Sequence, residues 1–178
     1  MRGLGIIQRE DPLLRRVAPS FSLPADADLA HLIVNTLLNR AAQVRGVHEF
    51  SKGMGLAAPQ LGLSRRVAIV QLAGAEAPIV LLNARAVASS TETDEPRYEG
   101  CLSFFDVRGR LRRPLAIEVE HQDFDGGWHR TTHTGSAARL VAHEIDHLDG
   151  VFYTDRMPAD EHPIPVREYR DTGKRWRY

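Results

Sequence analysis

The sequence predicts an α+β fold in a single domain. After residue 26, apolar residues recur every three to four positions, as in a helix that packs on a core, and a second helix is expected over residues 136–148. Short β-like runs lie between these helices, and strands grouped in this way favour α+β over regular βαβ alternation. A chain of 178 residues is long enough to bury one core and too short for two domains.

The first part of the chain is expected to form a loop and then a helix. Residues 11–24 contain three prolines, which interrupt regular structure. The helix should begin near Asp26 or Asp28, either of which can cap it, and end near Gly46. Its apolar face is expected to comprise Leu29, Ile33, Leu37, Ala41 and Val44.

The expected strands follow in the middle of the chain. Residues 67–72 and 79–82 are short apolar runs, and residues 115–120 alternate apolar and polar side chains, as in a half-buried strand. Asp125-Gly126-Gly127 predicts a hairpin turn into a strand over residues 128–134. The second helix should then run to residue 148, where Asp149-Gly150 ends it.

The composition excludes several classes of protein. The 23 basic and 23 acidic side chains balance, so no overall field draws the chain to nucleic acid or to an anionic membrane. A single cysteine excludes an internal disulfide and favours a reducing compartment. No apolar run approaches the roughly 20 residues that span a bilayer, and no signal peptide is evident. We expect a soluble, cytoplasmic protein.

The strongest chemical signal is His143-Glu144-Ile145-Asp146-His147. Two histidines four residues apart lie on one face of a helix, so both imidazoles can bind one ion, and Glu144 borders the same site. A catalytic site needs a third protein ligand and an open position for water. The spacing alone leaves several candidates for that ligand: Cys101, His121, His129, His133 and the acidic residues.

A second stretch, Gly53-Met54-Gly55-Leu56-Ala57-Ala58-Pro59-Gln60, suggests a backbone that passes close to a ligand. Gln60 would supply an amide donor there. The alternative is a flexible loop, because two spaced glycines carry little information by themselves.

Together with Glu99-Gly100-Cys101-Leu102-Ser103, these stretches resemble the three signature motifs of the peptide deformylase family, in the family's order. The resemblance covers about residues 6–157 and includes the N-terminal segment Asp11 to Ala18. It implies β-sheets, antiparallel or mixed, packed around a central helix that carries the two histidines. It also implies removal of the formyl group from N-formylmethionine of newly made proteins, by attack of metal-bound water on the formyl carbon.

The resemblance assigns Cys101, His143 and His147 as ligands of one divalent ion. The family's usual native metal is Fe(II), which zinc, nickel or cobalt often replaces. A set of two imidazoles and one thiolate contains nothing that excludes zinc.

The resemblance also assigns the catalytic groups. Glu144 acts as general base and then as general acid. The Gln60 side-chain amide and the Leu102 backbone N–H donate to the oxyanion. Gly53 and Gly55 are expected to leave space and backbone contacts for the substrate.

The sequence departs from the family pattern in the expected substrate pocket. Ser136 stands where the family has a bulky apolar residue beside the methionine pocket, and Arg97 lies where apolar residues are common. Such a polar wall would weaken the preference for methionine. Arg108 and Arg113 match arginines near the substrate backbone, with exposed loop arginines as the alternative, and Glu99 is expected to support the site.

Three other functions stay open at this point: hydrolysis of an N-formyl compound other than formylmethionine, metal-stabilised binding without catalysis, and zinc-dependent proteolysis. The catalytic domain is expected over residues 1–161. The polar tail over residues 162–178 is expected to be flexible, with a transient contact to ribosomal RNA as the alternative. No stable nucleic-acid binding and no membrane binding are expected.

Overall fold

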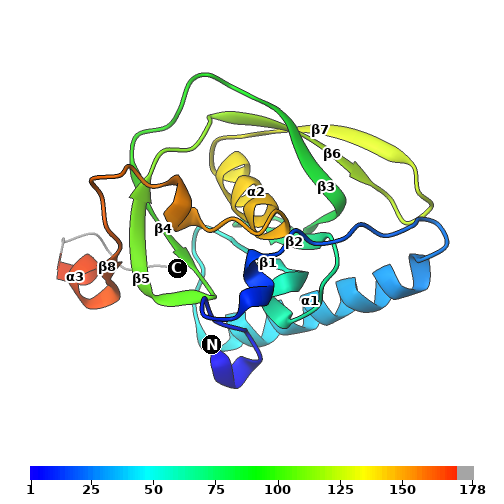
Figure 1. The fold of residues 1–178 in the computed structure, drawn as a ribbon, viewed down its shortest axis with the longest axis horizontal. Helices are drawn as coiled ribbons and strands as arrows, with labels where there is room; N and C mark the ends of the chain where they lie inside the picture. The colour runs from blue at the N-terminus through cyan, green and yellow to red at the C-terminus, as the bar shows by residue number, and fades with distance from the viewer. Residues whose placement is uncertain (172–178) are drawn as a thin grey trace.

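The computed structural model describes residues 1–171 and has an α+β architecture (Figure 1). One antiparallel sheet has the order β1-β2-β3-β6-β7, and a second has the order β4-β5-β8. The bounds of the larger sheet are β1 Met54–Ala57, β2 Val67–Gln71, β3 Ile79–Ser89, β6 Ala116–Gln122 and β7 Trp128–Thr134. The smaller sheet comprises β4 Arg97–Cys101, β5 Phe104–Leu111 and β8 Ile164–Pro165. The α+β prediction, with antiparallel sheets, is confirmed.

Within residues 1–171, three α-helices accompany the sheets: α1 Ala27–Val47, α2 Gly135–Leu148 and α3 Val166–Asp171. Figure 1 shows α2 at the centre of the molecule and α1 along one side. The described part of the chain also contains four short 3-10 helices: η1 Arg2–Leu4, η2 Pro12–Arg15, η3 Ala58–Leu61 and η4 Tyr153–Arg156. Within the described residues, no helix is both long enough and apolar enough to cross a membrane.

Helix α1 follows the prediction in its extent and differs in its buried face. Leu29 is 37% exposed, so its expected burial is wrong. Ala30 and Val34 are buried instead, beside Ile33 and Leu37, because the helix meets β1 and β2 one residue further round its surface. Small side chains at these positions let the helix approach the sheet closely.

The structure confirms the hairpin of β6 and β7, and it extends the second predicted strand to residue 89 as β3. The stretch over residues 53–60 contains β1, which pairs with β2, so it is not a flexible loop. Strands β4 and β5 were not predicted. Their turn brings Cys101 opposite Phe104 and places the cysteine beside α2.

Helix α2 is buried on two sides, which explains why it can carry a site inside the molecule. Ala138, Val141, Ile145 and Leu148 pack into the core against the larger sheet. The polar side chains over residues 143–147 are buried on other faces of the same helix, toward the smaller sheet and η4. Burial of so many polar groups requires partners for each of them.

Two described elements, β8 and α3, fall in the tail that the sequence separates from the catalytic domain. Strand β8 pairs with β5, with Pro165 opposite Val107 and Ile164 opposite Arg108. The basic and aromatic end over residues 172–178, where a contact with RNA was considered, lies outside the described residues.

Candidate active site

The end of β4 and two turns of α2 bring three metal-binding side chains together. One ligand atom each from Cys101, His143 and His147 lies within 4.8 Å of the other two. The Cys101 sulfur is 3.1 Å from His147 Nε2. In the described part of the chain this is the one such group, and His121, His129 and His133 lie on the β6–β7 hairpin outside it. The geometry thus selects Cys101 among the candidate third ligands.

The chemistry of this donor set fits a divalent transition metal. Burial alone would raise the pKa of the Cys101 thiol, but His147 and His143 outweigh it and lower that pKa to about 5. The thiolate, which is the ligating form, is therefore favoured near neutral pH. A soft thiolate with two imidazoles suits iron, zinc, cobalt or nickel and is a poor site for magnesium or calcium.

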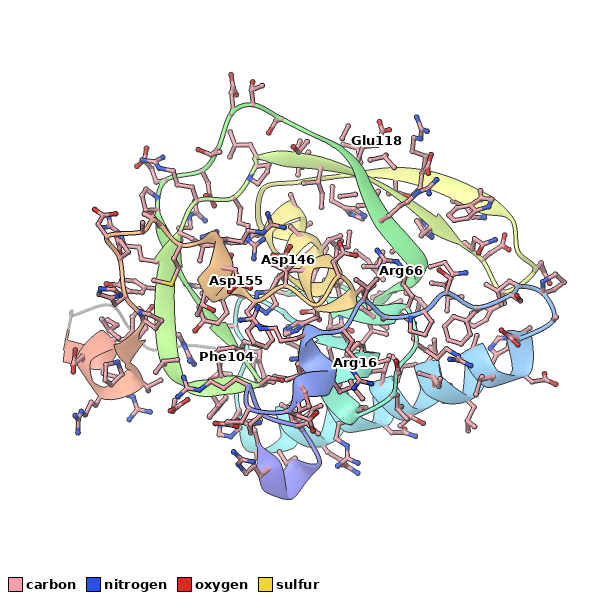
Figure 2. All side chains as sticks on the ribbon, viewed as in Figure 1. Arg16, Arg66, Phe104, Glu118, Asp146 and Asp155 are labelled. Atoms are coloured by element: carbon pink, nitrogen blue, oxygen red, sulfur yellow. The ribbon has the colours of Figure 1, made fainter. Side chains whose placement is uncertain are left out.

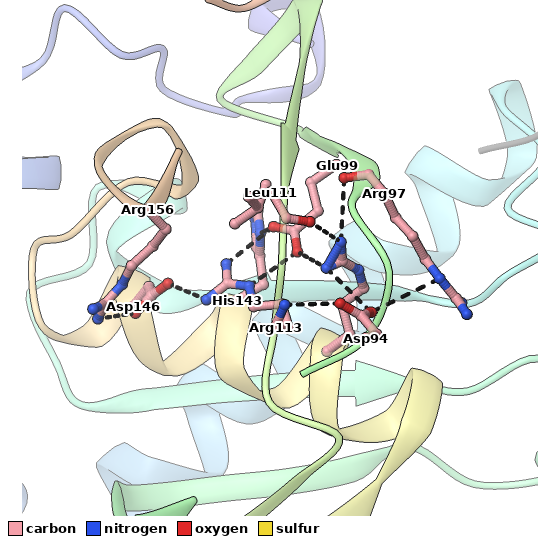
Figure 3. A network of polar contacts seen from close by, with 9 residues as sticks. Asp94, Arg97, Glu99, Leu111, Arg113, His143, Asp146 and Arg156 are labelled. Carbon is pink, nitrogen blue, oxygen red and sulfur yellow. Dashed lines mark hydrogen bonds and ion pairs between the residues drawn. The ribbon is translucent and has the colours of Figure 1, made fainter. Parts of the chain in front are cut away.

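Glu99 fixes the orientation of the first histidine. Its Oε2 lies 3.1 Å from His143 Nδ1, which leaves Nε2 of this ring for a metal ion (Figure 3). The aromatic ring of Tyr153 stacks on the same imidazole with ring centroids 5.9 Å apart. His143 is thus held by a hydrogen bond at one edge and by a ring on one face.

Arg113 in turn holds Glu99 and connects it to α2. Its Nε and Nη2 donate to the two Glu99 oxygens at 2.9 and 3.0 Å, and its Nη1 donates to Asp146 Oδ2 at 2.6 Å (Figure 3). The other Asp146 oxygen accepts from Arg156 at 2.8 Å. Burial alone would lower the pKa of the Arg113 guanidinium, but Glu99 and Asp146 outweigh burial and raise that pKa. Burial alone would raise the pKa of the Glu99 carboxyl, but His143 and Arg113 outweigh burial and lower it. Glu99 and Arg113 are therefore both charged.

Figure 2 shows the contrast between this interior network and the ordinary surface charges. Asp146 belongs to α2 and lies at the centre of the molecule, whereas Glu118, on β6, lies toward the top of the view. The Glu118 carboxylate pairs with an exposed arginine, Arg130, at 3.2 Å. Exposed pairs of this kind contribute little to stability, whereas a broken buried pair is costly.

Glu144 is buried beside the metal ligands without a hydrogen-bond partner for one oxygen. Its Oε2 is enclosed and unpartnered in the described structure. Burial raises the pKa of this carboxyl to about 7, with His143 and His147 acting in the opposite direction. A carboxyl poised near neutrality can both accept and deliver a proton. The missing side chain of Gly55 makes room for it, because a Cβ there would overlap the Glu144 carboxylate.

Gln60 is oriented by the backbone of its own turn. Its Oε1 accepts the Ala57 N–H at 2.9 Å, which turns the amide nitrogen toward the Cys101 sulfur at 3.4 Å and the Ser103 hydroxyl at 3.3 Å. The side chain is 1% exposed. Gln60 therefore presents a donor beside the metal ligands, and Leu102 follows Cys101 directly on the same wall.

A cavity of about 470 Å³ opens onto these groups. It is lined by all six residues expected to bind substrate: Gly53, Gly55, Arg97, Glu99, Arg108 and Ser136. The lining also includes residues that were not singled out from the sequence, among them Lys52, Asp94, Arg139 and Tyr169. The cavity therefore joins the metal ligands to the first turns of α2 and to the start of β4.

The two arginines that were considered as exposed loop residues are both buried. Arg108 lies against Gly100, where a Cβ would come within 2.5 Å of the guanidinium, and donates to the carbonyls of Phe105 and Val107. Arg113 does not line the cavity; it belongs to the network behind Glu99. The exposed-loop alternative is thus wrong for both.

Known proteins match this chain over nearly its whole length. The polypeptide deformylase family matches residues 4–162. The chain is 36% identical to peptide deformylase 2 of Nostoc sp. over 94% of this chain and 93% of that one, and 39% identical to a peptide deformylase of Chlorobium phaeobacteroides over 83% and 76%. The crystal structure of the Thermotoga maritima peptide deformylase superposes with a TM-score of 0.72 at 31% identity, covering 86% and 96% of the two chains.

The chain belongs to the polypeptide deformylase family. It removes the N-formyl group from N-formylmethionine at the start of newly synthesised polypeptides, as the sequence predicted. Deformylases are metalloenzymes, and Cys101, His143 and His147 form the metal-binding group of this one. The family match decides against a binding protein without catalysis and against a zinc protease.

Two features of this deformylase had no clear signal in the sequence. Asp94 precedes β4, outside every motif, and comes to the cavity only through the fold. Tyr169 comes from α3, more than 20 residues beyond the metal-binding motif. Arg139 could have been predicted to lie near the site, because it precedes His143 by four residues and so shares that face of α2.

Proposed function

We propose that Cys101, His143 and His147 hold one divalent ion, Fe(II) in the native protein, with zinc, nickel or cobalt as substitutes. The favoured thiolate supports a soft transition metal, and Glu99 supports His143 as the neutral ligand through its Nδ1–H. When bound, such an ion supplies Lewis-acid activation of water and of the formyl oxygen.

Glu144 moves the proton in this proposal. Its unpartnered Oε2 accepts a proton from the attacking water, and the same carboxyl then delivers that proton to the departing amine nitrogen. The carbon–nitrogen bond of the formamide breaks, so formate and a free amino terminus are the products. A pKa of about 7 suits both transfers near neutral pH.

Gln60 and Leu102 stabilise the charge that develops on the formyl oxygen. The Gln60 amide nitrogen is aimed at the site because Ala57 holds the other end of that amide. The Leu102 N–H adds a backbone donor next to the Cys101 ligand. Loss of one donor of this kind costs about a hundredfold in rate.

The cavity binds the peptide. Gly53 and Gly55 have no side chains to fill the cavity beside β1. The remaining space is lined by Arg97, Glu99, Arg108 and Ser136. The Met-Ala-Ser-bound peptide deformylase of Acinetobacter baumannii, at a TM-score of 0.72 and 26% identity, supports a peptide in this position.

The observation that carries the mechanism is the enclosed Glu144 carboxylate beside the three ligands, and Glu144→Gln tests it. We expect this variant to retain its metal, measured by elemental analysis after anaerobic purification, and to lose about 10²–10⁴-fold in turnover of formyl-Met-Ala. Glu76→Gln, at an exposed position, is the matched control and should match the parent in both measurements. Unchanged turnover of Glu144→Gln would overturn the mechanism.

The metal assignment is tested separately. Cys101→Ala is expected to purify without stoichiometric metal and without activity, because a thiolate ligand is gone. An active, metal-replete Cys101→Ala protein would contradict the assignment. Elemental analysis of the anaerobically purified parent identifies the native ion, and iron in place of zinc is the expected result.

We further propose a cytoplasmic location and a transient ribosome contact, because the substrate is a nascent chain. Binding to nucleic acid or membranes is not expected from a balanced charge of 23 basic and 23 acidic side chains. Cosedimentation with ribosomes tests the contact, with a chain lacking residues 172–178 as the comparison. Equal sedimentation of the two chains would exclude a role for that segment.

A further inference from the structure

One wall of the cavity carries charged side chains where the substrate's first side chain has to lie. Arg139 and Ser136 come from the first turns of α2, and Asp94 and Arg97 come from the approach to β4. Within the described residues, the cavity lining contains four basic side chains, Lys52, Arg97, Arg108 and Arg139, against three acidic ones. One of those acids is Glu144, the proton carrier. The rest of the lining is therefore net positive.

This wall is within reach of the residue that carries the formyl group. Arg139 precedes His143 by four residues, which is about 6 Å along the helix, and Ser136 lies about 10 Å away. The formyl carbon sits at the metal centre and is joined to the Cα of that residue through one nitrogen, so the Cα lies about 2.5 Å from it. An extended side chain of four or five atoms then ends beside Arg139. This step rests on the proposed function of the site.

Arg139 has capacity for a further acceptor. Its side chain is 12% exposed, and its Nε and Nη1 are enclosed without a hydrogen-bond partner. Nη1 lies 3.0 Å from Glu99 Oε1 as an ion pair, and Nη2 donates to the backbone carbonyls of Arg97 and Leu111. Glu99 is already shared with Arg113 and His143. Nε is thus an enclosed donor without an acceptor, and Nη1 has ion-pair contacts without a hydrogen bond.

Asp94 offsets only part of the positive charge of this wall, through two ion pairs without hydrogen bonds. Its Oδ1 accepts the Arg113 backbone N–H at 2.8 Å. Its Oδ2 lies 3.6 Å from Arg139 and 3.8 Å from Arg97, and both distances are longer than a hydrogen bond. One carboxylate therefore stands loosely between two guanidinium groups, and the Arg97 side chain is 63% exposed.

We infer that this cavity accepts an acidic side chain on the formylated residue, in addition to methionine, with Arg97 and Arg139 as the residues that recognise the carboxylate. Guanidinium groups bind carboxylates through charge-assisted hydrogen bonds, which are stronger than neutral ones. In an enclosed site, where the effective dielectric constant is low, the attraction between a guanidinium and a carboxylate is also stronger than in water. The substrate class is an N-formyl peptide, or a smaller N-formyl amino compound, that bears a carboxylate at the end of the side chain of its formylated residue.

Formyl peptides of equal length test the inference in the metal-loaded enzyme. Formyl-Glu-Ala and formyl-Gln-Ala differ in charge and have nearly the same shape, and formyl-Met-Ala reports on the established activity. We expect kcat/KM for formyl-Glu-Ala to exceed that for formyl-Gln-Ala at least about tenfold. A Glu-to-Gln ratio of kcat/KM of one or less would overturn the inference. The proposed function would still hold in that case, provided that the enzyme turns over formyl-Met-Ala. Preference for formyl-Lys-Ala would overturn the inference too, and would assign Asp94 as the recognition group.

Variants and a binding measurement separate recognition from folding. Arg97→Gln and Arg139→Gln should each lower the Glu-to-Gln ratio about tenfold and leave the metal content unchanged. Arg85→Gln, which removes an exposed arginine paired with Glu120, is the matched control and should keep the parental ratio. If Arg139→Gln fails to fold, the exposed Arg97 still provides the test. If Arg97→Gln and a correctly folded Arg139→Gln both keep the parental Glu-to-Gln ratio of kcat/KM, the assignment of these two arginines is contradicted.

The binding measurement does not depend on turnover. Titration calorimetry of the metal-loaded protein with N-acetyl-Glu-Ala and N-acetyl-Gln-Ala should give tighter binding for the glutamate compound. Equal affinity would overturn the inference. Absence of turnover on every formyl peptide would instead count against the proposed function, so the two failures are distinguishable.

Discussion

Gly55 lies where strand β1 passes closest to Glu144, and the absence of its side chain sets the position of the catalytic carboxylate. The sequence suggested that this glycine leaves room for substrate, and the cavity does reach it. The closer neighbour is Glu144, whose carboxyl group occupies the place of a Cβ. Space for the proton carrier therefore requires glycine at this position.

Gly55→Ala is expected to displace the Glu144 carboxylate and lower kcat about a hundredfold or more, by analogy with other losses of positioned acid–base groups. The metal content should stay at that of the parent, because neither histidine moves. Steady-state kinetics with formyl-Met-Ala and elemental analysis measure the two effects.

Gly46→Ala provides the control for that substitution. Gly46 lies in α1 with nothing within 4 Å of its added Cβ, so alanine there should leave kcat unchanged and stabilise the helix by about 0.5–1 kcal/mol. A Gly55→Ala enzyme with parental kcat would show that Glu144 relaxes at no cost.

At the same scale, the site was only partly predictable. The two histidines and Glu144 follow from the helical period, because neighbours on one helix have fixed geometry. Cys101 lies 42 residues before His143, and no local rule fixes where such a residue lies in space. The resemblance named it, and the turn between β4 and β5 is what places it. Arg139 could have been identified from its spacing to His143, whereas Asp94 could not.

At the scale of elements, the buried ions of Arg113, Glu99 and Asp146 connect β4, the end of β5 and α2. Arg113→Leu would leave two buried carboxylates short of a partner. We expect it to lower the free energy of unfolding by about 3 kcal/mol and the metal affinity about 10- to 100-fold. Denaturant unfolding and competition with a metal chelator measure these effects.

Arg112→Leu is the control for this network, because Arg112 precedes Arg113 and its side chain is 51% exposed. It should change the free energy of unfolding by less than about 1 kcal/mol. Similar losses in both variants would show that the network is worth no more than surface pairs. Composition alone does not separate these two arginines; the resemblance singled out Arg113, and the fold places it between Glu99 and Asp146.

The β6–β7 hairpin carries a second set of titratable groups, on the face that includes Ile117 and Val119. His133 pairs with Ile117 in register, and His121 pairs with His129. Burial lowers the pKa of both His121 and His133, and the charge of His121 lowers that of His133 further. Asp123 acts in the opposite direction on His121. In the folded protein these two histidines therefore resist protonation.

A histidine whose pKa is lower in the folded state binds fewer protons there than in the unfolded chain. Its stabilising contribution is present above the unfolded pKa of about 6.5 and is lost as the pH falls through that value toward the folded pKa. We expect the free energy of unfolding of the metal-loaded protein to decrease as the pH is lowered from about 7.5 to about 5.5. His133→Gln should reduce that slope, measured by urea unfolding across the pH range.

His162→Gln, at an exposed position, is the control. Both variants keep the metal ligands, so these contribute equally to the two pH dependences, and His162→Gln should keep the parental slope of the free energy of unfolding against pH. Identical slopes for His133→Gln and His162→Gln would exclude the hairpin as a source of the pH dependence.

The predicted elements divide by how local their causes are. Helix α1, the hairpin and helix α2 follow from periodicity, a Gly-Gly turn and a terminating glycine, all of which act within a few residues. Strand β1 was concealed by Gly55 within it and by Gly53 and Pro59 beside it, because its structure comes from pairing with β2. Strands β4 and β5 contain many charged residues, which conceals the few apolar ones that point inward. Glu99 joins the buried ions, and Phe104 and Leu111 pack into a small apolar cluster.

For the molecule as a whole, the segment after residue 161 completes the cavity of the deformylase. Strand β8 adds to the edge of β5, and α3 then brings Tyr169 against Tyr98 with ring centroids 5.0 Å apart. Tyr169 is 9% exposed and lines the cavity. The division between a catalytic domain over residues 1–161 and a tail stays a prediction. The contacts favour a tail that contributes to substrate binding.

A chain that ends at residue 161 tests this division. It loses the β8–β5 pairing and the Tyr169 wall, so we expect KM for formyl-Met-Ala to rise about 2- to 10-fold, the worth of one aromatic contact. The kcat should stay close to that of the parent, because no metal ligand or proton carrier is removed. A chain that ends at residue 171 keeps β8 and α3 and should retain the parental KM. The Tyr169→Ala variant of the full chain should show the same rise in KM as the chain that ends at residue 161. Equal KM values for the chains ending at 161 and 171 would show that the catalytic domain is complete without this segment.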